Sequence, residues 1–364
     1  MKRFLMLLLL FPLFCGCAYA EETPEHALQI FDAAQMEENL NETERSIGGT
    51  ISTGGYDVNA ALRRLWHSFA EKLKNQLRED IGFVSRLLVL VFLCAFSCSI
   101  CNEERIRETV EICGACAAAA LLTGGMSSLV NETSAAVYRL SDYSKAALPA
   151  VYTAAAASGG VSTAAIGYAQ AAFALEAMMS LSQKAVIPLV YATLALTLAD
   201  VIFPNPILAG MQKISKWAAK TCLTATTLTF TACLGISTLI SSKVDAAALK
   251  TTRTLISGTL PIVGGMISDA SSAVLSAASV MLSCMGAFGL IACCAICVGP
   301  FAVLMVKGML FKSAAVIAEA VDVPKLHRLF SGINSTLSLM MGLLGANAIM
   351  LFLSLAAAMK VVTN

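Results

Sequence analysis

The sequence has few charged residues and few histidines for its length. Charged side chains make up 13% of the 364 residues, and only three histidines are present. Soluble domains carry about 25% charged residues, so this composition argues against a soluble globular protein. The net charge of +1 shows no basic excess of the kind that accompanies nucleic-acid binding. We therefore expect no nucleic-acid partner.

No motif for catalysis is recognisable either. The histidines His26, His67 and His327 are scattered, and the GxxxxGK[ST], HExxH and GxSxG motifs do not occur. Three Cys-x-x-Cys pairs have the spacing of metal or redox sites, but most lie in apolar stretches, where a thiol behaves as a small hydrophobic side chain. The pairs are Cys98/Cys101, Cys113/Cys116 and Cys294/Cys297. We predict no enzyme activity, no metal site and no cofactor.

Long apolar runs dominate what is present. Apolar residues make up 57% of the chain, and the mean hydropathy is +0.74. A transmembrane helix needs about 20 such residues in succession. Six stretches qualify, namely 83–101, 110–130, 185–203, 217–241, 283–306 and 337–359. Residues 146–175 and 254–281 could be weak spans, re-entrant segments or helices that line a polar cavity. The sequence thus predicts an all-α, polytopic bundle of six to eight transmembrane helices.

The N-terminus has the pattern of a targeting segment. Lys2 and Arg3 precede an apolar run, and Ala18-Tyr19-Ala20 fits a small-x-small cleavage site. We predict a cleavable signal peptide over 1–20, with an uncleaved anchor helix as the alternative. Residues after the cleavage site would then begin outside the cytoplasm.

The next segments are expected to form an arm and a first helix pair. Residues 21–82 read as a short extracytoplasmic arm that ends in an amphipathic helix, with Asp57 as its cap and Trp66 suited to an interface. This helix either docks a partner or a membrane surface, or packs on its own protein. Residues 83–130 would form a first helix pair, and 131–364 a polytopic membrane domain.

Proline spacing points to an internal repeat. Pro149 and Pro188 are 39 residues apart, as are Pro261 and Pro300. Two copies of one unit would then cover 140–241 and 252–355, and internal repeats are common in transport folds. Chance spacing of the nine prolines is the alternative. Runs of small residues also fit close helix packing, within one chain or in a homo-oligomer.

Two acidic residues lie where a charge is costly. Asp200 is near the end of an apolar span, and Asp269 is on the polar side of the amphipathic stretch 254–281. Charged side chains inside a membrane usually have a use, such as lining a polar cavity or an ion path. The alternative for each is an interfacial residue or a partner of a loop lysine.

One stretch resembles a known family. The sequence TLPIVGGMISDASSAVLSAASVM over 259–281, followed by GAFGLI over 286–291, is similar to the stage III sporulation protein AE family. The resemblance covers roughly 140–360 and, in overall layout, the whole chain. The motif positions are Pro261, Gly264, Gly265 and Asp269.

The resemblance implies a role in endospore formation. Members are regarded as non-enzymatic membrane subunits of a channel-like or secretion-like complex between the mother cell and the forespore. The implied partners are the other membrane proteins of that complex and membrane lipid, and the implied location is the mother-cell-derived membrane around the forespore. A stand-alone secondary transporter or permease is the alternative, and the possible repeat and Asp269 favour it.

Overall fold

The computed structural model describes residues 33–49, 56–100, 103–159, 161–203, 205–259 and 263–360, although the side chains of 235–277 are outside the described part. These described residues are almost entirely helical and contain no strand. The elements are α3 (Ala33–Glu38), α4 (Glu42–Gly48), α5 (Val58–Ile100), α6 (Glu104–Ala157), α7 (Val161–Leu181), the π-helical turn η1 (Ser182–Val186), α8 (Ile187–Ile202), α9 (Pro206–Thr259), α10 (Val263–Ala320) and α11 (Pro324–Lys360).

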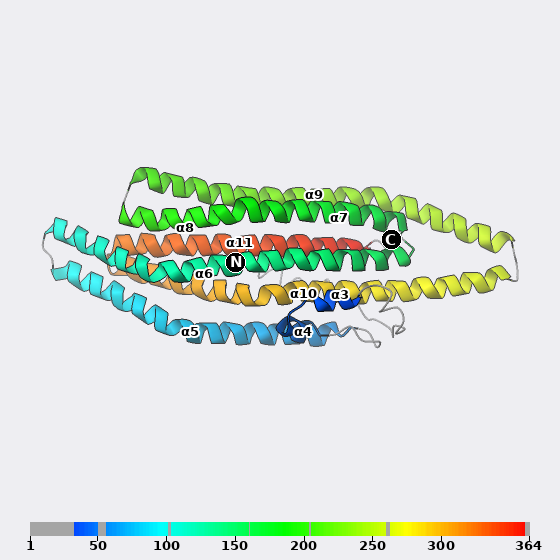
Figure 1. Ribbon diagram of the computed structural model, residues 1–364, viewed down its shortest axis with the longest axis horizontal. Helices are drawn as coiled ribbons and strands as arrows, with labels where there is room; N and C mark the ends of the chain where they lie inside the picture. Colours follow the sequence, from blue (N-terminus) through cyan, green and yellow to red (C-terminus); the bar gives the residue numbers. More distant parts are fainter. Residues whose placement is uncertain are drawn as a thin grey trace.

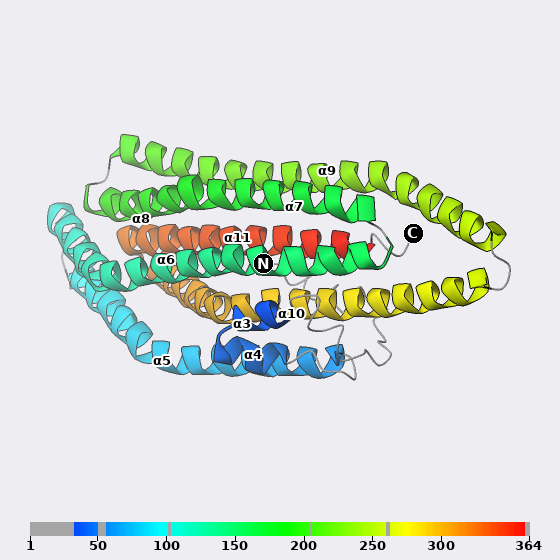
Figure 2. The same ribbon diagram turned by 45° about the vertical axis from the view of Figure 1, so that its right-hand side comes forward.

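The long helices lie side by side in an elongated bundle. In Figure 1, α9 runs along one edge and α5 along the other, with α11, α6 and α10 between them, and the short helices α3 and α4 lie near α5 and α10. The turned view keeps α5 and α9 on opposite edges (Figure 2). A helix of 58 residues such as α10 is roughly 87 Å long. Because the apolar core of a bilayer is about 30 Å thick, the bundle extends well beyond one membrane.

Local sequence signals set several helix ends. Asp57 caps α5, as predicted, because its Oδ1 accepts a hydrogen bond from the backbone N–H of Ala60 at 3.0 Å. Gly159 ends the turn after α6 with a φ of +106°, a conformation that favours glycine. The wide turn η1 lies just before Pro188, whose ring excludes the carbonyl of Lys184 from normal α-helical geometry.

The all-α class and the membrane character predicted from the sequence are confirmed. Within the described part of the chain, five helical segments are long and apolar enough to cross a membrane: Val58–Ile100, Glu104–Ala157, Val161–Ile202, Ala278–Ala320 and Pro324–Met359. The total of six to eight spans and the internal repeat stay predictions. The signal peptide over 1–20 lies outside the described residues.

Helix boundaries differ from the predicted segments in two places. The amphipathic helix 57–82 and the apolar span 83–101 belong to one continuous helix, α5. Residues 146–175 contain the turn between α6 and α7, so this stretch is not one straight span. The division of the chain at residue 131 lies inside α6 and stays a prediction.

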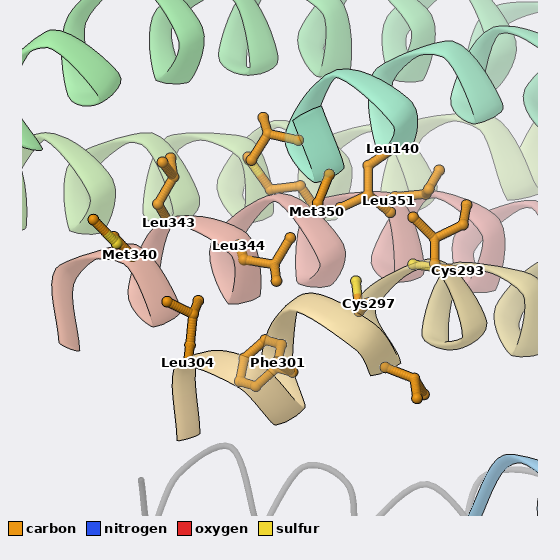
Figure 3. Packing of buried hydrophobic residues seen from close by; sticks show 14 of the residues in the cluster. Leu140, Cys293, Cys297, Phe301, Leu304, Met340, Leu343, Leu344, Met350 and Leu351 are labelled. Atoms are coloured by element: carbon orange, nitrogen blue, oxygen red, sulfur yellow. The ribbon is translucent and has the colours of Figure 1, made fainter. Parts of the chain in front are cut away.

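The core centres on the antiparallel pair α10 and α11. No charged residue occurs between Ala270 and Val306 of α10 or between Leu329 and Met359 of α11. The two stretches face each other, since Cys293 Sγ lies 3.7 Å from the carbonyl oxygen of Ala348. Figure 3 shows buried side chains of α10 gathered against those of α11, with Leu140 of α6 beside them; the α10 and α11 residues labelled include Cys297, Phe301, Leu304, Leu344 and Leu351. Burial of this apolar surface is the main stabilising contribution within the pair.

Close approach of α11 to α8 requires glycine at one position. A Cβ at Gly332 would meet Cγ2 of Thr197, and Thr197 is held in place by a 2.7 Å hydrogen bond to the carbonyl of Thr193. Gly332→Ala should therefore destabilise the protein by about 1–3 kcal/mol through overpacking. Thermal unfolding in detergent, followed by circular dichroism, measures the change.

Gly210 provides the matched control for this substitution. A Cβ at this helical position of α9 meets nothing within 4 Å, so Gly210→Ala should stabilise the protein by about 0.5–1 kcal/mol through helix propensity. Equal unfolding temperatures for the two variants would contradict the close packing of α11 on α8.

Candidate functional site

Helices α5 and α10 lie side by side and run in the same direction. Three pairs of residues establish this parallel arrangement, since they follow the same order along α10 and along α5 with Tyr56 just before it. The pairs are Tyr56 with Phe288 (ring centroids 5.6 Å apart), Lys72 Nζ beside Gly299, and Phe83 with Phe311 (6.4 Å). The N-terminal half of α5 therefore packs along the most apolar part of α10.

The charges of these two neighbours follow opposite patterns. Charged residues crowd the first half of α5, while α10 has none from Ala270 to Val306. Beyond Asp80, α5 carries only Arg86, whereas α10 carries Lys307, Lys312 and Glu319. The charged residues of the first half of α5 are Arg63, Arg64, Glu71, Lys72, Lys74, Arg78, Glu79 and Asp80.

A buried ion pair lies where both patterns change. Lys307 Nζ of α10 is 2.8 Å from Asp80 Oδ1 of α5, and the two side chains are only 20% and 9% exposed. Gln76 donates a 3.0 Å hydrogen bond to the other carboxylate oxygen of Asp80, and the Lys307 ammonium lies 5.8 Å from the ring centroid of Phe83. Both carboxylate oxygens thus have a partner, and the ammonium pairs with the carboxylate beside an aromatic ring, inside a largely apolar interface.

The predicted amphipathic helix packs on its own protein. Ala61 and Leu65 of α5 are buried, whereas the opposite side of the same segment is exposed and charged. Of the two readings left open by the sequence, packing on the chain is therefore confirmed for one face. Within the described part of the molecule, the other face is largely uncovered, and only α4 adjoins it, beside Arg63, Arg64 and His67.

The described part of the N-terminal arm is tied to the bundle by a second ion pair. Arg139 of α6 contacts the buried carboxylate of Glu44 in α4. Glu44 also accepts a 3.0 Å hydrogen bond from the backbone N–H of Asn41, as in a capping box. Helix α4 packs against α10 and α5, and this ion pair ties it to α6.

A further set of ion pairs ties the α5–α6 end of the bundle to the turn between α10 and α11. Arg107 of α6 contacts Asp322 in that turn, and Lys325 Nζ of α11 is 3.4 Å from Glu108 Oε1. This end of the bundle is thus rich in charge, although the outer side of α5 there is apolar. The exposed apolar residues are Val89, Phe92, Leu93, Phe96 and Ile100.

Helices α8 and α9 meet through hydroxyl and amide groups. Thr193 Oγ1 and Ser215 Oγ are 2.9 Å apart, and Gln212 donates to Thr197 Oγ1 at 2.5 Å. Hydrogen bonds of this kind hold transmembrane helices together without a formal charge.

The predicted acid Asp200 lies beyond these contacts, partly buried near the end of α8. Burial lowers the pKa of Lys216 in α9, Lys220 lowers it further, and the Asp200 carboxylate raises it. Asp200 therefore interacts electrostatically with Lys216 across the turn between α8 and α9.

The surroundings of the predicted motif lie outside the described part of the structure. Pro261 lies outside the described residues, and Gly264, Gly265 and Asp269 belong to α10 with side chains outside the described part. Their role stays a prediction. The Asp80–Lys307 pair was not predicted, although one signal was available: Lys307 directly follows the long uncharged stretch of α10, where a charge calls for a partner.

The cysteines contribute no ligand set within the described part of the chain. No group of three His, Cys, Asp or Glu side chains in that part could hold a metal ion. Buried Cys293 and Cys297 instead pack within the apolar core.

Comparison with known proteins gives one match. The family model described as stage III sporulation protein AE (spore_III_AE) matches residues 47–361, which is nearly the whole chain and includes α5 to α11. The search of curated proteins and the search of solved structures each gave no match.

The buried ion pair makes a testable contribution to stability. Lys307→Met leaves the Asp80 carboxylate without its cation, so unfolding should become easier by about 3 kcal/mol. The double variant Asp80→Asn/Lys307→Met should recover most of that loss, because no uncompensated charge remains. Chemical unfolding in detergent, arranged as a double-mutant cycle, measures the coupling.

An exposed pair serves as the control for this cycle. Lys145 and Asp142 are 3.2 Å apart with side chains 58% and 71% exposed, and Lys145→Gln should change stability by less than about 0.5 kcal/mol. If Lys307→Met changes stability no more than Lys145→Gln, the pair does not hold α5 against α10.

Proposed function

The chain belongs to the stage III sporulation protein AE family, and from this membership we propose that it is a non-enzymatic integral membrane subunit of a channel-like or secretion-like complex between mother cell and forespore. The observation that carries the proposal is the match of the family model over residues 47–361. Membership of this family indicates a role in sporulation. The five apolar helices support a membrane location.

The shape of the bundle supports a subunit that meets other proteins. Helices α6 and α10 have 54 and 58 residues, more than twice the roughly 20 residues that span a bilayer. The remaining length lies outside the lipid, where it can contact soluble or membrane-bound partners. We place the protein in the mother-cell-derived membrane that surrounds the forespore, with the other membrane proteins of the complex as partners.

A stand-alone secondary transporter or permease is the second candidate. The equal spacing of Pro149/Pro188 and Pro261/Pro300 favours it, because transporter folds are often built from repeats. Transport by the purified chain alone distinguishes the two candidates. A subunit would conduct nothing by itself, whereas a secondary transporter would move its substrate in liposomes.

Affinity purification from sporulating cells tests the subunit hypothesis. A tagged chain, extracted in mild detergent, should co-purify with several other membrane proteins, and proteoliposomes of the purified chain should show no solute- or proton-dependent flux. The same tagged chain expressed in vegetative cells is the control and should be recovered without those partners. Flux from the single protein, or recovery from sporulating cells without any partner, would refute the proposal.

Asp269 is the acid that we expect to matter for this role. Asp269→Ala should lower the yield of heat-resistant spores while the variant chain still inserts into the membrane, because the carboxylate serves a polar contact or cavity and not insertion itself. Asp142→Ala, at an exposed acid of α6, is the control and should leave spore yield unchanged. A normal spore yield for Asp269→Ala would remove this residue from the functional site.

A further inference from the structure

We propose that the exposed charged face of α5 borders water at the depth of the bilayer, where it forms a cationic wall that favours anions. This face, called the α5 charged face below, consists of Arg63, Arg64, His67, Glu71, Lys72, Lys74, Arg78 and Glu79, all of which are exposed. The inference deepens the channel role proposed above and rests on it.

The depth of the α5 charged face follows from its neighbour. Tyr56 packs against Phe288 and Lys72 lies beside Gly299, so the face runs alongside residues 288–306 of α10. That part of α10 pairs with the uncharged stretch of α11 through Cys293 and Ala348. These two stretches are the longest in the described chain without a charged residue, and they provide the level at which the bundle fits the apolar core of a bilayer.

Contact of the α5 charged face with acyl chains would be costly at this level. A charged side chain at the centre of a bilayer costs about 2.5–3.5 kcal/mol even on the most permissive scale. Across the described residues, the only ion pair within the face is His67 with Glu71, at 3.9 Å. Apart from Lys72, whose Nζ lies beside Gly299 of α10, these side chains extend away from the packed face that Ala61 and Leu65 occupy. A water-filled space beside α5 would hydrate these charged side chains at the level where α10 lies in the apolar core of the bilayer.

The charge of the face selects the solute. Five basic residues oppose two acidic ones on it, and rings or walls of Arg and Lys favour anions in pores. Between α4 and α5 the surface is hollowed into a groove of about 640 Å³. Its basic lining comes from Arg63, Arg64, His67 and Lys72, Glu71 adds one carboxylate, and hydroxyl groups of Ser46 and Ser68 adjoin them. The groove has the donors and the room to hold a hydrated anion such as inorganic phosphate.

A residue on the opposite edge of the bundle provides the matched control. Leu228 of α9 is 65% exposed, and nearby Leu223 contacts Gly342 of α11. Leu228 therefore lies near the level of Ala348 and Cys293, as does His67 on α5. The two positions share a depth, and their helices α5 and α9 lie on opposite edges of the bundle (Figures 1 and 2).

Site-directed spin labelling tests the proposal on the purified full chain in phosphatidylcholine liposomes. In a cysteine-depleted background, labels at His67→Cys and Leu228→Cys are exposed to oxygen, which partitions into lipid, and to a neutral nickel chelate, which stays in water. We expect several-fold greater nickel accessibility at position 67 and greater oxygen accessibility at position 228. Lys74→Cys, also on the α5 charged face, repeats the measurement if the first variant folds poorly.

An anionic chromium oxalate probe tests the charge of the wall. Its accessibility at position 67, relative to the neutral chelate, should be raised several-fold at low salt. The ratio should fall towards unity in Arg63→Gln/Arg64→Gln and in high salt, because screening shortens the range of the attraction.

Three results would overturn the inference. Oxygen-rich, nickel-poor labels at position 67 would place the α5 charged face in lipid, and nickel-rich labels at both 67 and 228 would place this level of the bundle outside the bilayer. An unchanged chromium oxalate ratio in the double variant would remove the preference for anions. Since the measurement uses the chain alone, it is independent of whether partners co-purify from sporulating cells.

Discussion

The ion pair between Asp80 and Lys307 fixes how α5 lies against α10, and much of the molecule depends on that placement. Both charges are largely buried, so a shift of α5 by one turn, 5.4 Å, would leave each without its partner. Apolar packing alone tolerates such a shift more readily, because hydrophobic contact is not directional. The pair therefore supplies the register that the surrounding leucine, alanine and phenylalanine side chains do not specify.

This register brings unlike segments to the same level. The charged first half of α5 lies beside the uncharged part of α10, and the apolar second half of α5 lies beside Lys312 and the charged turn after α10. The apolar core of a bilayer is about 30 Å thick. It cannot contain the apolar stretches of both helices without also containing charged residues of one of them. The physical resolution is that one face of the bundle meets water where the opposite face meets lipid. A protein that supplies part of an aqueous path through a membrane has this asymmetry, which agrees with a subunit of a larger assembly.

Other parts of the bundle use milder polar contacts. Helices α8 and α9 join through Thr193, Ser215 and Gln212, and Gly332 lets α11 approach Thr197 closely. Such contacts add specificity at low electrostatic cost, because hydroxyl and amide groups carry no formal charge. Formal charges are concentrated instead at the ends of the bundle and on α5, where water or an ion-pair partner is within reach.

Local features of the sequence were sufficient to predict the helices, their apolar character and several of their ends. The cap at Asp57 followed from the residues themselves, because capping depends only on nearby backbone. The family resemblance likewise rests on a short stretch, although the full match extends over 47–361. The partnership of Asp80 with Lys307 joins residues 227 positions apart. Hydropathy and periodicity describe one segment at a time. Only the tertiary structure therefore decided which part of one helix lies beside which part of another, and which charged face is left largely uncovered.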